Sequence, residues 1–133
     1  MRLFVALVLP VVSSFLGAQA LADEVGRSEY LAACAGCHGR SAEGNGSMSQ
    51  NLNINAPNLT NLALRNGGVF PFERTLRLID GRDEVRLHGS PMPIWGERFF
   101  AVASESEDAR DAEIETRGRL LSLVYYLESV QKK

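Results

Sequence analysis

Apolar residues recur at helical spacing near both ends and in the middle of the chain. The first such segment covers residues 25–33, where Gly26 and Tyr30 share a face. A second helix is predicted to begin at Pro71, which suits a first helical turn, and to end at Gly81. Because no segment alternates apolar and polar residues over the length of a strand, the pattern predicts an all-α protein.

The last predicted helix has the broadest apolar face. Ser104 and Glu107 resemble a capping box near its expected start. The face itself is made by Leu120, Leu121, Leu123, Val124, Tyr125, Leu127 and Val130.

Two segments interrupt the helical pattern. Residues 39–61 are rich in glycine, asparagine and serine, which predicts a long loop that wraps around the rest of the domain. Residues 88–98 contain two glycines and two prolines, and they predict a second irregular segment.

The first 22 residues have the order of a secretory signal peptide. A short basic start precedes an apolar run over residues 3–12, and small-x-small cleavage sites follow at residues 18–20 and 20–22. We therefore expect residues 1–22 to be cleaved on export and residues 23–133 to form one domain. The alternative is an uncleaved membrane anchor, against which the polar residues in the stretch argue.

Charge excludes one class of function and leaves another open. With 14 Lys+Arg against 16 Asp+Glu in 133 residues, the chain lacks the basic field of a nucleic-acid-binding protein. The acids cluster at residues 104–115, where there are six of them and one arginine. We interpret this cluster as acids near the positive end of a helix, with a docking patch for a basic partner as the alternative.

The motif that carries chemistry is C-A-G-C-H, from Cys34 to His38. Cys-x-x-Cys-His is the attachment signature of c-type haem. On one helical turn Cys34, Cys37 and His38 project toward one side, so two thiols can add to the two vinyl groups of a haem while the imidazole reaches its iron. Ala35 and Gly36 are small, and we expect them to leave room for the flat macrocycle.

Three other interpretations of the two cysteines remain open. A thioredoxin-like redox pair would follow a strand, and none is predicted. A zinc site would need four ligands, for which only Cys34, Cys37, His38 and His88 are available. A disulfide between Cys34 and Cys37 would close a loop too short to add much stability.

Together with M-P-x-W-G at Met92–Gly96 and the final L-V-Y-Y-L-E-S-V-Q, the haem motif resembles the class I mono-haem c-type cytochromes of bacteria. The resemblance covers about residues 25–130. It implies a cytochrome c fold, in which three to five helices and long irregular loops wrap one covalently bound haem. It also implies an exported protein of the periplasm, with haem c attached through Cys34 and Cys37.

The resemblance implies that the iron is held by His38 on one face and Met92 on the other. A thioether is a soft, neutral ligand that favours ferrous iron, and the prolines on either side of Met92 fix its backbone. His88 and Met48 are the alternative sixth ligands, and an open sixth site is the third possibility.

Further residues match features of the same family. Pro57, in A-P-N-L, is expected to offer its carbonyl to the ring of His38, because an iron-bound histidine needs a partner that fixes its tautomer. Leu59 is expected to form an apolar wall, and Trp95 to pack near the haem edge or in the core. Arg82 and Arg86 are candidates for neutralising haem propionates or for ordinary surface positions.

In this family the first and last helices cross closely. Gly26 and Tyr30 on the first helix and Tyr125 on the last match the glycine and aromatic residues of that crossing. Gly118, Leu121 and Tyr125 share a face at helical spacing, which would allow a close approach.

The function implied is that of an electron carrier and not of an enzyme, because a haem ligated on both faces has no open position for a substrate. It would pass one electron between redox proteins: a membrane oxidoreductase complex, a terminal oxidase or a periplasmic dehydrogenase. We expect a monomer without a stable membrane insertion after cleavage. The alternatives are a haem c subunit of a periplasmic dehydrogenase complex, and a gas-binding or peroxidatic haem protein with an open sixth site.

Overall fold

The computed structural model describes residues 15–83 and 91–132, with side chains from residue 24 onward. This part of the chain is helical and contains no strand, so the prediction of an all-α protein is confirmed. The helices, in chain order, are α1 (Phe15–Ala33), α2 (Ala35–His38), α3 (Ser47–Asn51), α4 (Leu62–Arg65), α5 (Phe72–Asp80), α6 (Trp95–Ala103) and α7 (Ala109–Ser129).

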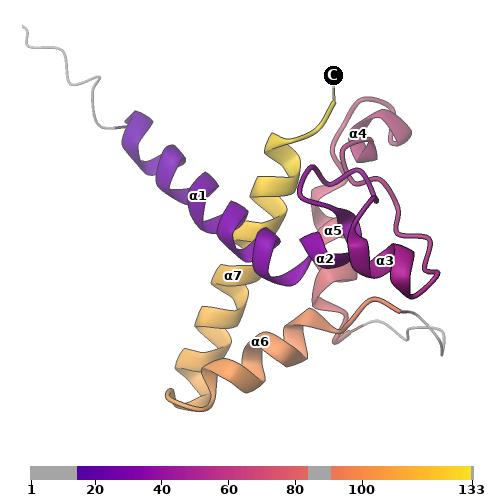
Figure 1. Cartoon of the computed structure of the whole chain (residues 1–133). Helices are drawn as coiled ribbons and strands as arrows, with labels where there is room; N and C mark the ends of the chain where they lie inside the picture. The colour runs from indigo at the N-terminus through magenta and orange to yellow at the C-terminus, as the bar shows by residue number, and fades with distance from the viewer. Residues whose placement is uncertain (1–14, 84–90, 133) are drawn as a thin grey trace, which may run out of the picture.

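Helix α7 is the element around which the others are arranged. It contacts α1, α5 and α6, while α2 contacts α1 and α3 (Figure 1). The first turns of α1, which include residues 15–22 of the predicted signal peptide, extend away from the other helices. Residues 1–14 of that predicted signal peptide lie outside the described residues.

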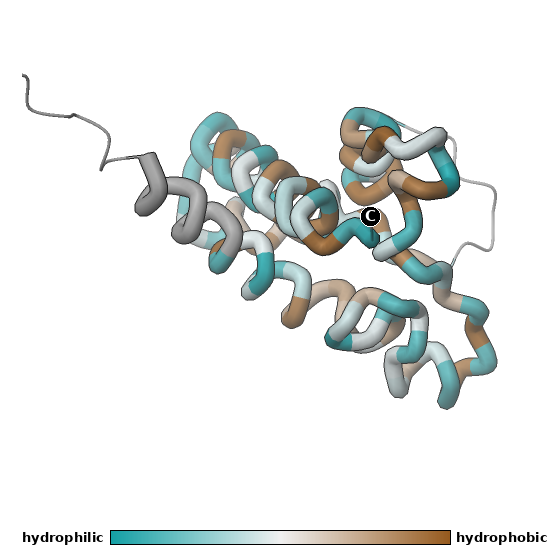
Figure 2. Tube along the Cα trace, turned by 90° about the horizontal axis from the view of Figure 1, so that it is seen from above, coloured by the Kyte–Doolittle hydropathy of each residue, from teal (hydrophilic) through white to brown (hydrophobic). Residues whose placement is uncertain are grey.

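None of the described helices is both long enough and apolar enough to cross a bilayer. Hydrophilic segments interrupt the hydrophobic ones along the helices, as the alternation of teal and brown in Figure 2 shows.

The crossing of α1 and α7 depends on a glycine. A Cβ atom on Gly26 would overlap the main-chain oxygen of Ser122 and lie 2.8 Å from the Cβ atom of Tyr126. One turn further along α1, the ring of Tyr30 packs on that of Tyr126 with centroids 5.2 Å apart. The predicted close crossing at Gly26 and Tyr30 is therefore confirmed.

The prediction for the α7 side of this crossing is wrong by one residue. The ring of Tyr125 packs on Phe72 of α5, with centroids 5.0 Å apart, and a Cβ atom on Gly118 would meet nothing within 4 Å. One residue along a helix of 3.6 residues per turn rotates a side chain by about 100°. The face that meets α1 is therefore that of Ser122 and Tyr126.

A partly buried ion pair connects α7 with α1, and its arginine also contacts α6. The guanidinium of Arg119 bonds both carboxylate oxygens of Glu29, each at 3.0 Å, and its carbon lies 4.1 Å from the ring centroid of Phe99. Around it lie the fully buried side chains of the core, which include Tyr30, Leu120, Leu123 and Val124.

Helix α6 and the start of α7 differ from the sequence predictions. Residues 95–98, predicted to be irregular, form the first turn of α6. Ser104 ends this helix, since its hydroxyl donates to the carbonyl oxygen of Phe100 at 2.7 Å. The cap of α7 is Asp108, whose carboxylate accepts from the amides of Arg110 at 2.9 Å and Asp111 at 3.1 Å.

The other boundaries follow the sequence more closely. Gly81 has a φ of +67° and ends α5, as predicted. The segment 39–61 is mostly irregular but contains the short helix α3. Four of the described helices, α1, α5, α6 and α7, have nine residues or more, and three have only four or five.

Candidate functional site

A largely apolar cavity of about 260 Å³ lies where α2, the segment 54–62, α5 and the segment 91–95 meet. Thr75, Ile79 and Leu127 are buried at its inner side, while Leu78 and the two prolines at 57 and 91 are exposed at its mouth. The lining is made by Ala33, Cys34, Cys37, His38, Ile54, Asn55, Ala56, Pro57, Leu59, Leu62, Thr75, Leu78, Ile79, Pro91, Met92, Pro93, Trp95 and Leu127.

The C-A-G-C-H motif forms one helical turn at the wall of this cavity. The amide of His38 donates to the carbonyl oxygen of Cys34 at 2.9 Å, and the amide of Cys37 donates to the same oxygen at 3.2 Å. This turn brings all three side chains of the motif to one cavity. The two cysteines are not joined by a disulfide.

His38 is held by the carbonyl that the sequence predicted. Its Nδ1 lies 3.1 Å from the main-chain oxygen of Pro57, which confirms this prediction. A carbonyl oxygen only accepts, so Nδ1 donates its proton, and the other ring nitrogen of a neutral imidazole then carries a lone pair. Only 8% of the residue is exposed, and this burial lowers the pKa of His38 although the bond to Pro57 opposes the shift. The ring is therefore neutral and able to bind a metal.

The segment that carries Pro57 is placed by the turn that follows the motif. The amide of Gly44 donates to the carbonyl oxygen of His38 at 2.8 Å, and the amide of Leu59 donates to that of Ala42 at 2.8 Å. Gly44 has a φ of +85°, and a Cβ atom there would overlap the main-chain oxygen of Ala56. The wrapped loop therefore has a defined path, which brings the Pro57 carbonyl to the histidine ring.

Met92 lines the same cavity as the motif, although more than fifty residues separate them in sequence. Trp95, at the start of α6, lines it as well, as does Leu59, which was predicted to form an apolar wall. His88 and Arg86, named from the sequence as an alternative ligand and a propionate partner, lie outside the described residues.

Met48 does not line the cavity. It is half-exposed, and its Sδ lies over Gly36, where an added Cβ atom would be 2.7 Å from the sulfur. Neither Ala35 nor Gly36, which were expected to leave room for a macrocycle, lines the cavity, and the missing side chain of Gly36 accommodates Met48.

The environment of Cys34 disfavours the thiolate form. Burial raises the pKa of Cys34 to about 12, and the charges of Glu29 and Cys37 add to the shift. Nucleophilic redox thiols have lowered pKa values and an electropositive surrounding. This observation argues against the thioredoxin-like interpretation. In the described part of the chain, no group of three His, Cys, Asp or Glu side chains is arranged to hold a metal ion.

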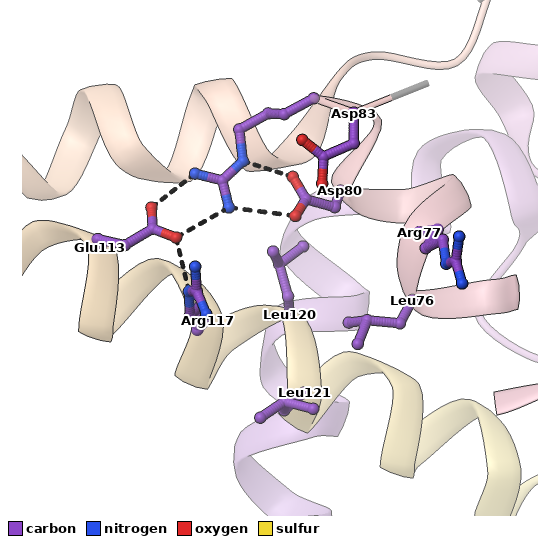
Figure 3. Close-up of a pocket in the computed structure, with 9 residues that line it drawn as sticks. Leu76, Arg77, Asp80, Asp83, Glu113, Arg117, Leu120 and Leu121 are labelled. Carbon is purple, nitrogen blue, oxygen red and sulfur yellow. Dashed lines mark hydrogen bonds and ion pairs between the residues drawn. The ribbon is translucent and has the colours of Figure 1, made fainter. Parts of the chain in front are cut away.

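Arg82 lies away from this cavity, and its predicted role toward propionates receives no support. Its guanidinium lies between the carboxylates of Asp80 and Glu113, at the edge of a second cavity of about 480 Å³ between α5 and α7 (Figure 3). Glu113 also pairs with Arg117 at 2.6 Å. The paired guanidinium groups lower the pKa of Glu113 to about 2. At least this acid of the 104–115 cluster is therefore engaged within the protein.

Gln131, to which no role was assigned from the sequence, connects the last described residues to the wall of the cavity. Its side-chain amide donates to the carbonyl oxygens of Leu59 at 2.9 Å and Leu127 at 2.6 Å, and its oxygen accepts from the amide of Ala63 at 2.9 Å. A lone glutamine near a chain end gives no pattern from which such contacts could be predicted.

Comparisons with protein-family models, with curated proteins and with solved structures found no match for this chain.

Proposed function

We propose that this protein is a mono-haem c-type cytochrome of class I that carries one electron between redox partners in the periplasm. The main support for the proposal is that one apolar cavity is lined by Cys34, Cys37, His38 and Met92. Two sulfurs, an imidazole and a thioether in one place form a donor set that suits covalent attachment and axial ligation of haem iron.

The character of the cavity supports the same proposal. Of its described lining residues, none is an Asp, Glu, Lys or Arg, and most are aliphatic, aromatic or proline. A flat, largely apolar macrocycle would be desolvated there without burying an unpaired charge. Haem would also add apolar core to a domain in which residues 39–61 contribute little of it.

Each residue has a defined task in this proposal. Cys34 and Cys37 would hold the haem covalently: each S–H would add across a vinyl group, with the sulfur bound to one vinyl carbon and the hydrogen to its neighbour. His38, oriented by Pro57, would supply a ring nitrogen to the iron, and Met92 would supply its thioether sulfur. When bound, haem supplies an iron that gains or loses one electron.

The mouth of the cavity is where a partner would approach. Pro57, Leu78 and Pro91 are exposed there, and they form an uncharged rim. If His38 and Met92 both ligate the iron, no position would remain on it for a substrate, and the haem would serve to carry one electron. The protein is therefore a carrier and not an enzyme, and its partners are redox proteins of the exported compartment.

The proposal is tested on protein purified from a bacterial host that matures c-type cytochromes. A denaturing gel stained for haem should retain colour at the size of the chain. The reduced-minus-oxidised spectrum should be that of a low-spin c-type haem, and carbon monoxide should bind the ferrous protein slowly. Loss of colour on denaturation would overturn covalent attachment, and rapid binding of carbon monoxide would indicate a gas-binding or peroxidatic site instead.

A further inference from the structure

Arg82 joins two helices through two bidentate ion pairs. Its guanidinium bonds Asp80, the last residue of α5, at 2.5 and 3.1 Å, and Glu113 of α7 at 2.6 and 3.3 Å. Figure 3 shows the carboxylates of Asp80 and Glu113 turned toward one another across the dashed bonds, with Arg117 below Glu113. Two carboxylates held by one planar fork give a fixed geometry that a lysine could not reproduce.

These ion pairs are more shielded from water than an ordinary surface pair. The side chains of Arg82, Asp80 and Glu113 are 25%, 23% and 29% exposed. In the pair between Arg77 and Glu73 on the outer face of α5, the exposures are 62% and 77%. Partial burial weakens solvent screening, so the Arg82 pairs hold their partners more firmly.

The start of α6 lies directly against this cluster. Gly96 is the second residue of α6 and is buried. A Cβ atom on Gly96 would overlap Oδ1 of Asp80 and lie 2.5 Å from Nε of Arg82. A side chain at this position would have to displace either α6 or the paired side chains of Asp80 and Arg82, so the glycine of M-P-x-W-G permits this contact.

The contact lies close in sequence to the predicted axial ligand. Met92 and Pro93 precede α6 by only a few residues, and Trp95, next to Gly96, lines the apolar cavity together with Met92. A helix whose first turn is held at Gly96 thereby fixes one end of the segment that carries Met92.

We propose that Arg82 is a positioning residue for Met92: by holding Asp80, Glu113 and the start of α6 together, it keeps the thioether where it can ligate the haem iron. This inference rests on the proposed function. A thioether is a weak ligand, so its bond to iron depends on how firmly its segment is held. Loss of such a supporting group typically costs about 10- to 100-fold in metal binding.

The test compares Arg82→Gln and Arg82→Lys with Arg77→Gln in the purified ferric and ferrous proteins. Arg77→Gln is the matched control, because it removes an exposed arginine of α5 at the same second cavity without touching Gly96. The readouts are the sulfur-to-iron charge-transfer band of the ferric form and the rate at which carbon monoxide binds the ferrous form.

We expect Arg82→Gln to keep its haem and its helical circular dichroism, to lose most of the charge-transfer band, and to bind carbon monoxide about tenfold faster or more. Arg82→Lys should lie between Arg82→Gln and the wild type, and Arg77→Gln should match the wild type. Gly96→Ala, which crowds the contact between α6 and the ion pairs without removing a charge, should change both readouts in the same direction and serves if Arg82→Gln does not fold.

Two results would overturn the inference, and they are distinguishable. If the wild type has haem and the band, and folded Arg82→Gln or Gly96→Ala keeps both readouts unchanged, Arg82 does not position Met92 while the proposed function stands. If the wild type carries no haem, or carries haem without the band, the proposed function or its Met92 ligand fails first.

Discussion

Replacing Gly26 by alanine tests the close crossing of α1 and α7. The turn that contains Cys34, Cys37 and His38 follows directly after α1. The added Cβ atom would overlap the main-chain oxygen of Ser122 and lie 2.8 Å from Cβ of Tyr126. A main-chain carbonyl within a helix cannot swing away, so the two helices must separate. Overpacking of this kind costs about 3 kcal/mol at its upper end. Alanine recovers about 1 kcal/mol of helix propensity, which leaves a net loss of about 2 kcal/mol.

The assay is thermal unfolding of the purified protein, followed by far-ultraviolet circular dichroism. For a domain of this size, about 2 kcal/mol corresponds to a melting temperature lower by roughly 10 °C. Gly118→Ala is the matched control, because an added Cβ atom there meets nothing within 4 Å. It should stabilise the protein by up to about 1 kcal/mol. If Gly26→Ala proves as stable as the wild type, the helices do not cross at this glycine.

Three further predictions concern the site and its surroundings. Met92→Ala should keep its covalent haem but lose the sulfur-to-iron charge-transfer band in the ferric spectrum; a surviving band would assign the sixth ligand elsewhere. The double variant Cys34→Ala with Cys37→Ala should contain no haem and should fail to fold, and native-like helical circular dichroism would contradict this. Glu113→Gln should lower the free energy of unfolding by about 1 kcal/mol at neutral pH. Folding lowers the pKa of Glu113 from 4.5 to about 2. The contribution of its charge to the free energy of unfolding is therefore fully present above pH 4.5 and is lost as the pH falls toward 2. Over that range the denaturant midpoints of the variant and the wild type should converge. A difference that persists at the acidic end would show that the carboxylate charge is not responsible.

The sequence was most informative where one residue type determines the local backbone. Gly81 ended α5 because a left-handed residue stops a helix, and Pro57 met His38 because an expected metal-binding imidazole needs an acceptor. The first feature depends on the backbone preference of one residue, and the second on one hydrogen-bond donor and its acceptor. Neither prediction required knowledge of how the helices pack.

The register of the helix crossing could not be predicted in the same way. The apolar face of α7 is so broad that the stripe through Tyr125 and the stripe through Tyr126 both satisfy helical spacing. Only the position of α5, where Phe72 takes the ring of Tyr125, decides that Tyr126 faces α1.

The start of α7 and the role of Arg82 were missed for a related reason. Ser104 and Glu107 fit the spacing of a capping box, but Ser104 closes α6 and Asp108 caps α7 three residues before Asp111. Arg82 could pair with any of several acids, and charge alone does not show which of them the fold brings near. Such choices depend on tertiary packing, which spacing and composition do not specify.

The central claim is that Cys34 and Cys37 attach one haem covalently, and the intact mass of the protein under denaturing conditions tests it most directly. Protein purified from a host that matures c-type cytochromes should have the mass of the chain from residue 23 plus one haem. Replacing Cys34 and Cys37 by alanine should remove the haem mass. A wild-type mass equal to the polypeptide alone, with two thiols that react with an alkylating reagent, would contradict the account.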